Sequence, residues 1–275
     1  MDLSVIIVSY NVKDKLKNNL TALVKSLGVN FEIFVIDNAS TDKTTEMMSA
    51  EFPGIKLISN DTNLGFAVAC NQGIKLATGR YILLLNPDMR VTADTLFSAV
   101  EWLDKNEQAA ICGIKLVDEN NKIVPQVRNF PTVFDQFIIA SKLAHLMPWL
   151  LNNYLCSKFN YEAEARVDSI RGSFFIIRRA TLEILGLLDE RYFIWFEEVD
   201  YCRLALSKGL EVWYTPVATA TDYVGQSFKQ VDLITRQVYF KTSMLAYFEK
   251  WHSFWQVLVL RLGWLIGDLL VKIIS

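Results

Sequence analysis

The fold of this chain is decided by the stretch "NLGFAVACNQGIKLATGRYILLLNPD", residues 63–88. It starts with a polar turn and continues with small and apolar residues at helical spacing over 66–77, before Gly79 as a stop signal. The run "YILLL" that follows is too short for a helix and too continuously apolar for a strand with one face in water. The stretch therefore predicts a helix followed by a buried strand.

The same pattern extends outward over residues 3–90. The apolar runs "LSVIIVSY", "FEIFVIDN" and "IKLISN" alternate with helix candidates over 12–28 and 41–51. Such alternation is typical of βαβ units, in which helices cover both faces of a parallel sheet. We therefore expect an α/β fold with a mainly parallel sheet.

The second half of the chain differs in texture. Residues 109–127 contain two apolar runs joined by a polar turn, which predicts an antiparallel hairpin and a mixed sheet. Residues 130–165 are aromatic-rich without clean periodicity, which predicts a flexible or substrate-covering segment. We expect strands within 167–179 and 210–219, and a helix over 197–209.

Composition limits the possible functions. The chain has 275 residues, of which 52% are hydrophobic, so it can bury a sizeable core. With 28 basic and 30 acidic residues it carries no basic field for nucleic acid, and a small ligand or a lipid is the expected partner. The four scattered cysteines fit neither a zinc site nor a disulfide framework and indicate a reducing compartment. The first residues predict a buried strand and no signal peptide.

Polar side chains follow three of the predicted strands, as "SYN" (9–11), "DNAS" (37–40) and "NPD" (86–88). Ligands of α/β sheets bind at the carboxyl ends of the strands, so these groups predict a binding site at one sheet edge. Asp88, beside Pro87, is suited to a hard divalent cation that also holds a diphosphate. Each group also has a plain interpretation as a turn former or helix cap.

The segment "WFEEVDYC", residues 195–202, places three carboxylates beside aromatic side chains. An apolar surrounding raises the pKa of a carboxyl group toward the range useful to a general base, which favours a functional role for Glu198. Glu197 and Asp200 lie three residues apart in a predicted first helical turn, so both could instead serve the helix. Trp195 could stack on a sugar or pack in the core.

Taken in order, "SVIIVSYN", "VIDNASTD", "NLGFAVACNQG", "LLLNPD", "RGSFFIIRR" and "FEEVDYCRLALSKG" closely resemble family 2 glycosyltransferases of the GT-A fold. The resemblance is greatest to the bacterial rhamnosyltransferase-like branch that builds cell-surface polysaccharides, and it spans about residues 3–230. It implies transfer of a sugar from a nucleoside diphosphate donor, such as dTDP-rhamnose, to a glycan or lipid-linked acceptor, with Mg²⁺ or Mn²⁺ as cofactor.

The resemblance also implies roles for single residues. Glu198 would be the catalytic base, Asp88 and Asp222 would hold the cation, and the acceptor side would include Trp195, Glu197 and Asp200. Asp37 would recognise the nucleotide base, and the remaining donor-binding residues would be Ser9, Asn11, Asn63, Gly65, Asn71 and Asn86.

Two departures from the family pattern keep an alternative open. Asp222 stands where the family commonly has a histidine, and Glu198 stands where it has aspartate. A catalytically impaired nucleotide-sugar-binding protein is therefore the second hypothesis. A dinucleotide-binding oxidoreductase is disfavoured, because "SYNVKDKL" after the first strand contains no glycine.

We expect a GT-A domain over 1–230 and a helical segment over 231–275. Residues 253–275 are very apolar but are interrupted by Arg261 and Asp268, which favours a helix in the plane of a membrane surface over one that spans it. Packing against the domain or in a homodimer is the alternative. The expected location is the cytoplasm, peripheral on the inner face of the membrane.

Overall fold

The computed structural model describes residues 1–223 and 231–274, with side chains up to residue 269. In this part of the chain a mixed central sheet has the order β3-β2-β1-β4-β10-β6-β11-β5, with β8 paired to β11. Its strands are β1 (Leu3–Ser9), β2 (Phe31–Asp37), β3 (Lys56–Ser59), β4 (Tyr81–Leu85), β5 (Met89–Val91), β6 (Ala109–Val117), β8 (Ala165–Arg166), β10 (Phe174–Arg178) and β11 (Glu211–Asp222).

The first half of the sheet confirms the βαβ prediction. β1 pairs in parallel with β2 and with β4, and β2 pairs in parallel with β3. The connecting helices are α1 (Lys13–Leu23), α2 (Thr44–Glu51) and α3 (Phe66–Leu76). α1 ends earlier than predicted: the N–H groups of Lys25 and Ser26 donate to carbonyls only three residues back, and the N–H of Leu27 donates to the carbonyl of Ala93 outside the helix.

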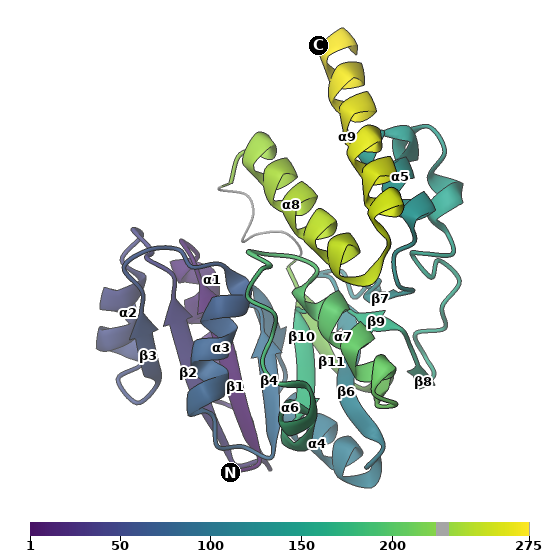
Figure 1. Ribbon diagram of the computed structural model, residues 1–275. Helices are drawn as coiled ribbons and strands as arrows, with labels where there is room; N and C mark the ends of the chain where they lie inside the picture. The colour runs from purple at the N-terminus through teal and green to yellow at the C-terminus, as the bar shows by residue number, and fades with distance from the viewer. Residues whose placement is uncertain (224–230, 275) are drawn as a thin grey trace.

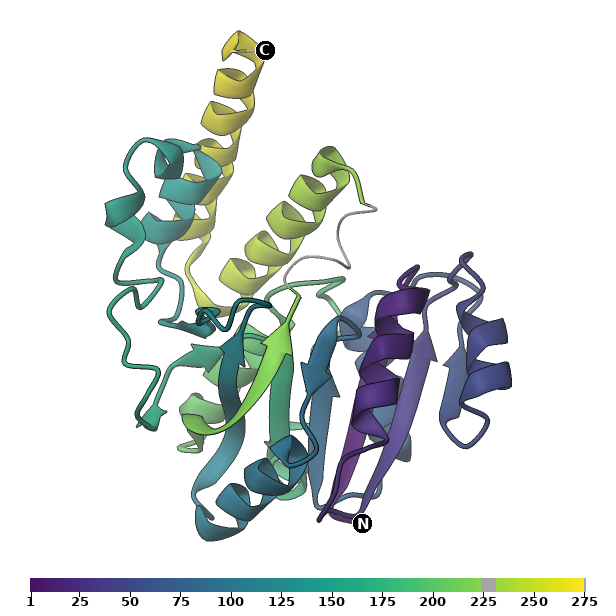
Figure 2. The same cartoon turned by 180° about the vertical axis from the view of Figure 1, so that it is seen from behind.

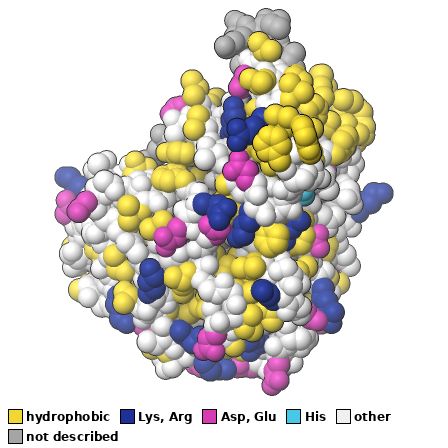
Figure 3. All heavy atoms as spheres, viewed as in Figure 1, with side chains coloured by type: hydrophobic (Ala, Val, Ile, Leu, Met, Phe, Trp, Pro, Cys, Tyr) yellow, Lys and Arg dark blue, Asp and Glu magenta, His cyan; other side chains and the backbone are white. Residues whose placement is uncertain are grey.

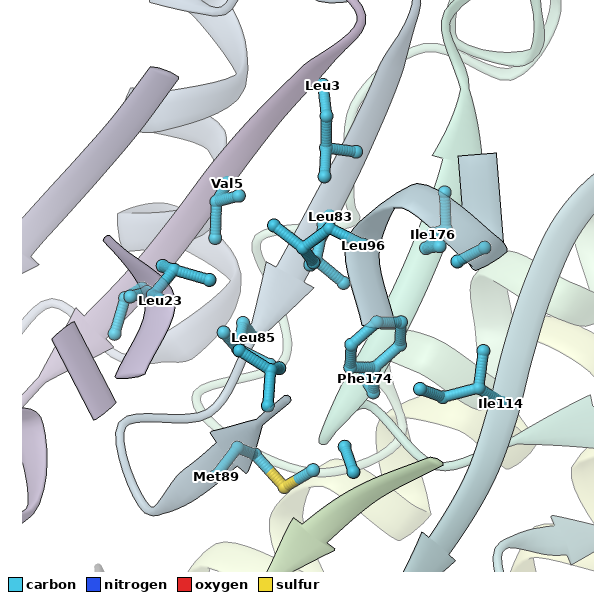
Figure 4. Packing of buried hydrophobic residues seen from close by; sticks show 14 of the residues in the cluster. Leu3, Val5, Leu23, Leu83, Leu85, Met89, Leu96, Ile114, Phe174 and Ile176 are labelled. Atoms are coloured by element: carbon cyan, nitrogen blue, oxygen red, sulfur yellow. The ribbon is translucent and has the colours of Figure 1, made fainter. Parts of the chain in front are cut away.

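Helices cover both faces of the sheet. α1, α2 and α4 (Thr95–Lys105) pack on one face, and α3, α6 (Arg179–Leu185) and α7 (Glu197–Ser207) pack on the other, as the two opposite views show (Figures 1 and 2). Alternate residues of each strand point to opposite faces. Leu3 and Val5 therefore pack with Leu83 and Phe174 in the core on the face covered by α1, α2 and α4 (Figure 4). The sheet is thus buried on both sides, as continuously apolar strands require.

The mixed sheet is confirmed, but its antiparallel strand is not the predicted one. β10 runs antiparallel between β4 and β6. The expected hairpin over 109–127 is reduced to one bridge between Val117 and Ile123. Pro125 follows, and it has no N–H group to donate to a ladder. Beyond it, β7 (Val127–Arg128) pairs with β9 (Ser169–Ile170) in a separate small sheet.

A third layer of helices lies beyond the carboxyl ends of the parallel strands (Figure 1). It contains α5 (Val133–Ala140), α8 (Leu233–Trp251) and α9 (Phe254–Ile274), with the short 3-10 turns Leu143–His145 and Pro148–Leu151. A buried cluster that includes Ala140, Phe248 and Trp264 joins these three helices.

The prediction of a flexible segment over 130–165 is therefore wrong for α5. A capping box between Thr132 and Asp135 starts this helix, and α9 packs along it. Gly263 and Gly267 permit the close approach, since a Cβ atom at either position would collide with α5. No helix in the described part of the chain is long and apolar enough to cross a bilayer.

Candidate active site

A cavity of about 660 Å³ opens at the carboxyl ends of β1, β2 and β4, where the polar groups were predicted to gather. The starts of α7 and α8 close its other side. The predicted site residues that line it are Asn11, Asn63, Gly65, Asn86, Asp88, Trp195, Glu197, Glu198 and Asp222. The structure thus gathers residues that are up to 211 positions apart, from Asn11 to Asp222, around one space.

The edge of the cavity at the ends of β1 and β2 is a network of short polar contacts between loops. The Asn11 side-chain oxygen accepts from the backbone N–H of Thr41 at 2.7 Å, and the Asn11 N–H donates to Ser40 Oγ at 2.9 Å. Asn11 adopts a left-handed backbone, with φ of 53°, which asparagine tolerates better than most residues. These contacts fix the end of β1 against the loop after β2.

Asp37 and Ser9 lie beneath this edge and do not line the cavity. Asp37 is buried, and its Oδ2 accepts from the N–H of Ser40 at 3.0 Å. Its Oδ1 and the Ser9 hydroxyl are buried without a hydrogen-bond partner among the described residues.

Gly65 is required by its neighbours. Its φ is +85°, and a Cβ atom there would meet the carbonyl oxygen and ring of Phe193. The Phe66 N–H donates to the same carbonyl at 2.6 Å, and the Asn63 side chain accepts from the Gly65 N–H at 3.0 Å. The start of α3 is thereby pressed against the segment that leads into α7.

Two of the predicted site residues, Asn71 and Asp200, tie neighbouring segments together. Asn71 is buried, donates to the Leu188 carbonyl at 2.9 Å and accepts from the Leu188 N–H at 3.0 Å, so its amide ties α3 to the segment before α7. Asp200 is also buried, and it accepts from Lys250 Nζ at 2.7 Å and from Trp251 Nε1 at 2.6 Å. Neither side chain is among the residues that line the cavity, and the donor role of Asn71 and the acceptor role of Asp200 stay predictions.

Asp88 and Asp222 are brought together by strand pairing. β11 pairs antiparallel with β5, with Asp222 opposite Met89, and the Tyr223 N–H donates to the Asp88 carbonyl at 3.2 Å. Both carboxylates are buried at the cavity wall. Mg²⁺ is commonly held by one or two carboxylates together with substrate phosphates. The pair therefore fits a divalent cation that would complete its coordination with a diphosphate.

Glu197 and Glu198 begin α7 and face the same cavity. Burial raises the pKa of Glu197 well above its ordinary value, and the neighbouring Glu198 charge adds to this effect. Burial also raises the pKa of Glu198, while backbone N–H groups and the charge of Arg171 act in the opposite direction. Glu198 is the less buried of the two, which suits it to exchange a proton with a bound molecule.

The segment that presents these carboxylates is strained. Trp195 and Phe196 both have positive φ, 64° and 70°, in a region that disfavours residues with a Cβ atom. Phe196 occupies the N-cap position of α7 without a side-chain cap. The two left-handed residues turn the chain sharply just before Glu197, and strain of this kind is frequent at active sites.

Several lining residues were missed by the sequence analysis. Arg171 lines the cavity 3.9 Å from Asp222, and its position inside the quoted "RGSFFIIRR" motif was the available signal. Tyr10 and Asn38 belong to the polar groups predicted at this edge but were given no role of their own. Thr235 and Tyr239 come from α8, for which no local pattern predicted a place at the cavity.

A comparison with solved structures agrees with this architecture. The mannosyltransferase PcManGT from Pyrobaculum calidifontis, solved in complex with GDP-Man and Mn²⁺, superposes with a TM-score of 0.59 at 18% identity. The match covers 90% of this chain and 63% of that chain. At this identity the likeness shows the fold alone, and that fold is GT-A.

Sequence comparison gives the family. The model described as "Glycosyl transferase family 2" matches residues 4–183. An N-acetylglucosaminyl-diphospho-decaprenol L-rhamnosyltransferase of Mycobacterium tuberculosis is 25% identical over 241 residues, 82% of this chain and 77% of that protein. Rhamnosyltransferase WbbL of Escherichia coli K12 is 27% identical over 227 residues, 80% of this chain and 82% of that protein.

The family match and the two relatives identify the chain as a glycosyltransferase. The chain belongs to glycosyl transferase family 2, as its ordered motifs predicted.

Proposed function

We propose that this protein is an inverting, metal-dependent glycosyltransferase that moves a sugar from a nucleoside diphosphate donor to a glycan or lipid-linked acceptor in cell-surface polysaccharide synthesis. The observation that carries the proposal is that Glu198 and the Asp88–Asp222 pair line one cavity. An inverting transfer needs a carboxylate to take the proton of the attacking hydroxyl on one side of the sugar. It also needs the leaving diphosphate to be held on the other side.

Glu198 is the proposed base, and Asp88 and Asp222 are the proposed ligands of Mg²⁺ or Mn²⁺. The cation, when bound, supplies positive charge to the leaving diphosphate. Asn11, Asn63, Gly65 and Asn86 are proposed to line the donor, and Trp195 and Glu197 the acceptor side. Asp37 is the proposed residue for recognition of the nucleotide base; it lies beneath the cavity wall, and its Oδ1 has no hydrogen-bond partner among the described residues.

The names of the bacterial relatives support the choice of substrates. Both are rhamnosyltransferases, and the mycobacterial name specifies a sugar on diphospho-decaprenol. We take dTDP-rhamnose as the candidate donor and a lipid-linked sugar as the candidate acceptor. Such an acceptor lies in a membrane, so the proposed location is the cytoplasm, on the inner membrane face.

The exposed face of α9 supports membrane contact. Gly263 and Trp264 face α5 and α8, while a stripe of apolar side chains on the opposite face is exposed, namely Trp255, Leu258, Leu262, Leu265 and Leu269. Figure 3 shows apolar side chains gathered at the end of the molecule where α9 and α5 lie. Trp264 itself is buried, so packing against the domain occupies one face of this helix, and membrane contact is proposed for the other face.

The first experiment measures release of nucleoside diphosphate from dTDP, UDP and GDP sugars, with Mg²⁺ or Mn²⁺ and lipid-linked acceptors. We expect release with one donor, its loss with EDTA, and a fall in kcat of at least about 100-fold in Glu198→Gln. Glu183→Gln, which changes an exposed carboxylate on α6, serves as the control and should behave as the native protein.

The catalytically impaired nucleotide-sugar-binding protein remains the second candidate, because of the Glu198 and Asp222 departures. It predicts donor binding by calorimetry without release for any acceptor, and the same binding in Glu198→Gln. Release that survives in Glu198→Gln would instead reject Glu198 as the base.

A further inference from the structure

The strained turn before α7 is held in place by contacts from α8. The Ser243 hydroxyl, which is buried, donates to the carbonyl of Ile194 at 2.8 Å. The Phe196 ring packs against Phe240 and Tyr247, with ring centroids 5.6 and 5.4 Å apart. These contacts come from successive turns on one face of α8, so the helix supports the turn along its length.

The carboxyl end of α8 also forms hydrogen bonds with the first turn of α7. Lys250 donates to Asp200 at 2.7 Å and to Asp189 at 3.0 Å, and Trp251 donates to the other oxygen of Asp200. The Asp200 N–H in turn donates to the Phe196 carbonyl at 2.8 Å. Asp200 is only 2% exposed, and a buried carboxylate contributes favourably only when it is paired in this way.

Left-handed φ angles at two consecutive aromatic residues persist only where the surrounding structure imposes them. The contacts that impose them here come from α8, on both sides of the turn. Glu198 follows Phe196 by two residues, so the direction of its carboxylate depends on that turn. None of these contacts of α8 involves Asn11 or Asn63, the residues proposed to line the donor.

We propose that Ser243 and Lys250 are positioning residues, through which α8 holds the Trp195–Phe196 turn and so aims Glu198 at the acceptor. The proposal rests on the proposed function of Glu198. It gives the helical segment after residue 230 a part in catalysis, in addition to any contact with a membrane.

The test uses the full chain and two readouts. Lys250→Met and Ser243→Ala are compared with the native protein by hydrogen–deuterium exchange of the peptide covering 193–199, and by steady-state kinetics of nucleoside diphosphate release. We expect exchange in this peptide to rise about fivefold or more, and kcat to fall about tenfold in Lys250→Met, with the donor KM within about twofold. Ser243→Ala should give smaller changes in the same direction.

Two further variants separate positioning from general damage. Lys250→Arg keeps a cation for Asp200 and should restore most of the kcat. Glu249→Gln removes an exposed ion pair with Arg261 on the neighbouring helix surface, and it should leave exchange and kcat unchanged. If Lys250→Met does not fold, as shown by its circular dichroism, the milder Ser243→Ala carries the test.

Native exchange in the 193–199 peptide of the variants would overturn the proposal, and so would faster exchange with native kcat. If either result came with an inactive Glu198→Gln, the proposed function would stand and only the role of α8 would fall. An active Glu198→Gln would remove the base assignment and the positioning proposal together, while the exchange data would still report how the turn is held.

Discussion

Glu197 and Glu198 are adjacent carboxylates at one cavity, yet their surroundings differ. Each glutamate has one oxygen that is buried without a hydrogen-bond partner among the described residues, but Glu197 as a whole is only 5% exposed. Glu198 is more exposed and faces the charge of Arg171. Neighbouring acids whose environments separate their pKa values are suited to different tasks. Glu197 is thereby favoured in its protonated form, and Glu198 is the one better placed to ionise.

Replacing Glu197 by glutamine should stabilise the protein at pH 8. The folded pKa of Glu197 is raised, so its burial contributes most to stability below the unfolded pKa near 4.5, and this contribution is lost as the pH rises through the folded pKa. We expect Glu197→Gln to raise the free energy of unfolding by about 1 kcal/mol or more at pH 8, and to have little effect near pH 4. Urea unfolding with EDTA at both pH values measures this.

The control for this prediction is Glu183→Gln, in which an exposed carboxylate is changed in the same way. A stability gain of Glu197→Gln that is equal at pH 4 and pH 8 would contradict the assignment, because only an ionising group gives a pH-dependent difference.

At the scale of elements, helices and strands that carry their own pattern were predictable. α3, α7 and the strands β1 to β4 were recognised because continuous apolar runs and stop signals are local properties of the sequence. α5 was missed, since its apolar face is completed by α9, more than 110 residues further along the chain. The roles of Asn71 and Asp200 depend on Leu188 and Lys250, which no local spacing connects with them.

The contact between α5 and α9 should be sensitive to the size of residue 267. A Cβ atom on Gly267 would collide with the backbone of Ala140, and backbone cannot move aside easily. Gly267→Ala is expected to lower the free energy of unfolding by about 1–3 kcal/mol. Gly54→Ala is the control, because nothing lies within 4 Å of the added carbon, and its effect should stay within about 0.5 kcal/mol. Equal effects of both substitutions in a thermal melt would reject this contact.

At the scale of the whole molecule, the polar groups that gather at the ends of the strands were more predictable from the sequence than the cavity wall formed by α8. Residues such as Asn11, Asn63 and Asp88 closely follow strands, and the carboxyl ends of parallel strands always share one edge of the sheet. Thr235 and Tyr239 reach the cavity only because the third helical layer is folded back over the sheet. The predicted boundary at residue 230 remains a prediction, and the cavity takes its walls from both sides of it.

Membrane contact is a property of the whole surface and can be tested without removing α9. The triple variant Trp255→Ser, Leu258→Ser and Leu262→Ser changes exposed side chains and leaves the buried face intact. We expect the native protein to float with anionic phospholipid vesicles, and the variant to lose about tenfold or more in the bound fraction.

Leu27→Ser is the control, because this side chain is 70% exposed and lies in the loop after α1. This variant should float like the native protein. If the triple variant still floats, the membrane contact is not made by the exposed face of α9. A native protein that stays in solution and sediments as a dimer, which the triple variant converts to a monomer, would assign the same face to a homodimer instead.

The pairing of β5 with β11 has a consequence for the order in which the protein matures. Asp88 is synthesised early, whereas its partner Asp222 stands in the strand that completes the sheet 134 residues later. On the ribosome, the first βαβ units can fold as soon as they emerge, because their contacts are local. A nascent chain shorter than 222 residues therefore holds the polar loops after β1 and β2 but lacks one of the two proposed cation ligands, so on this proposal it cannot bind the cation before β11 has been made.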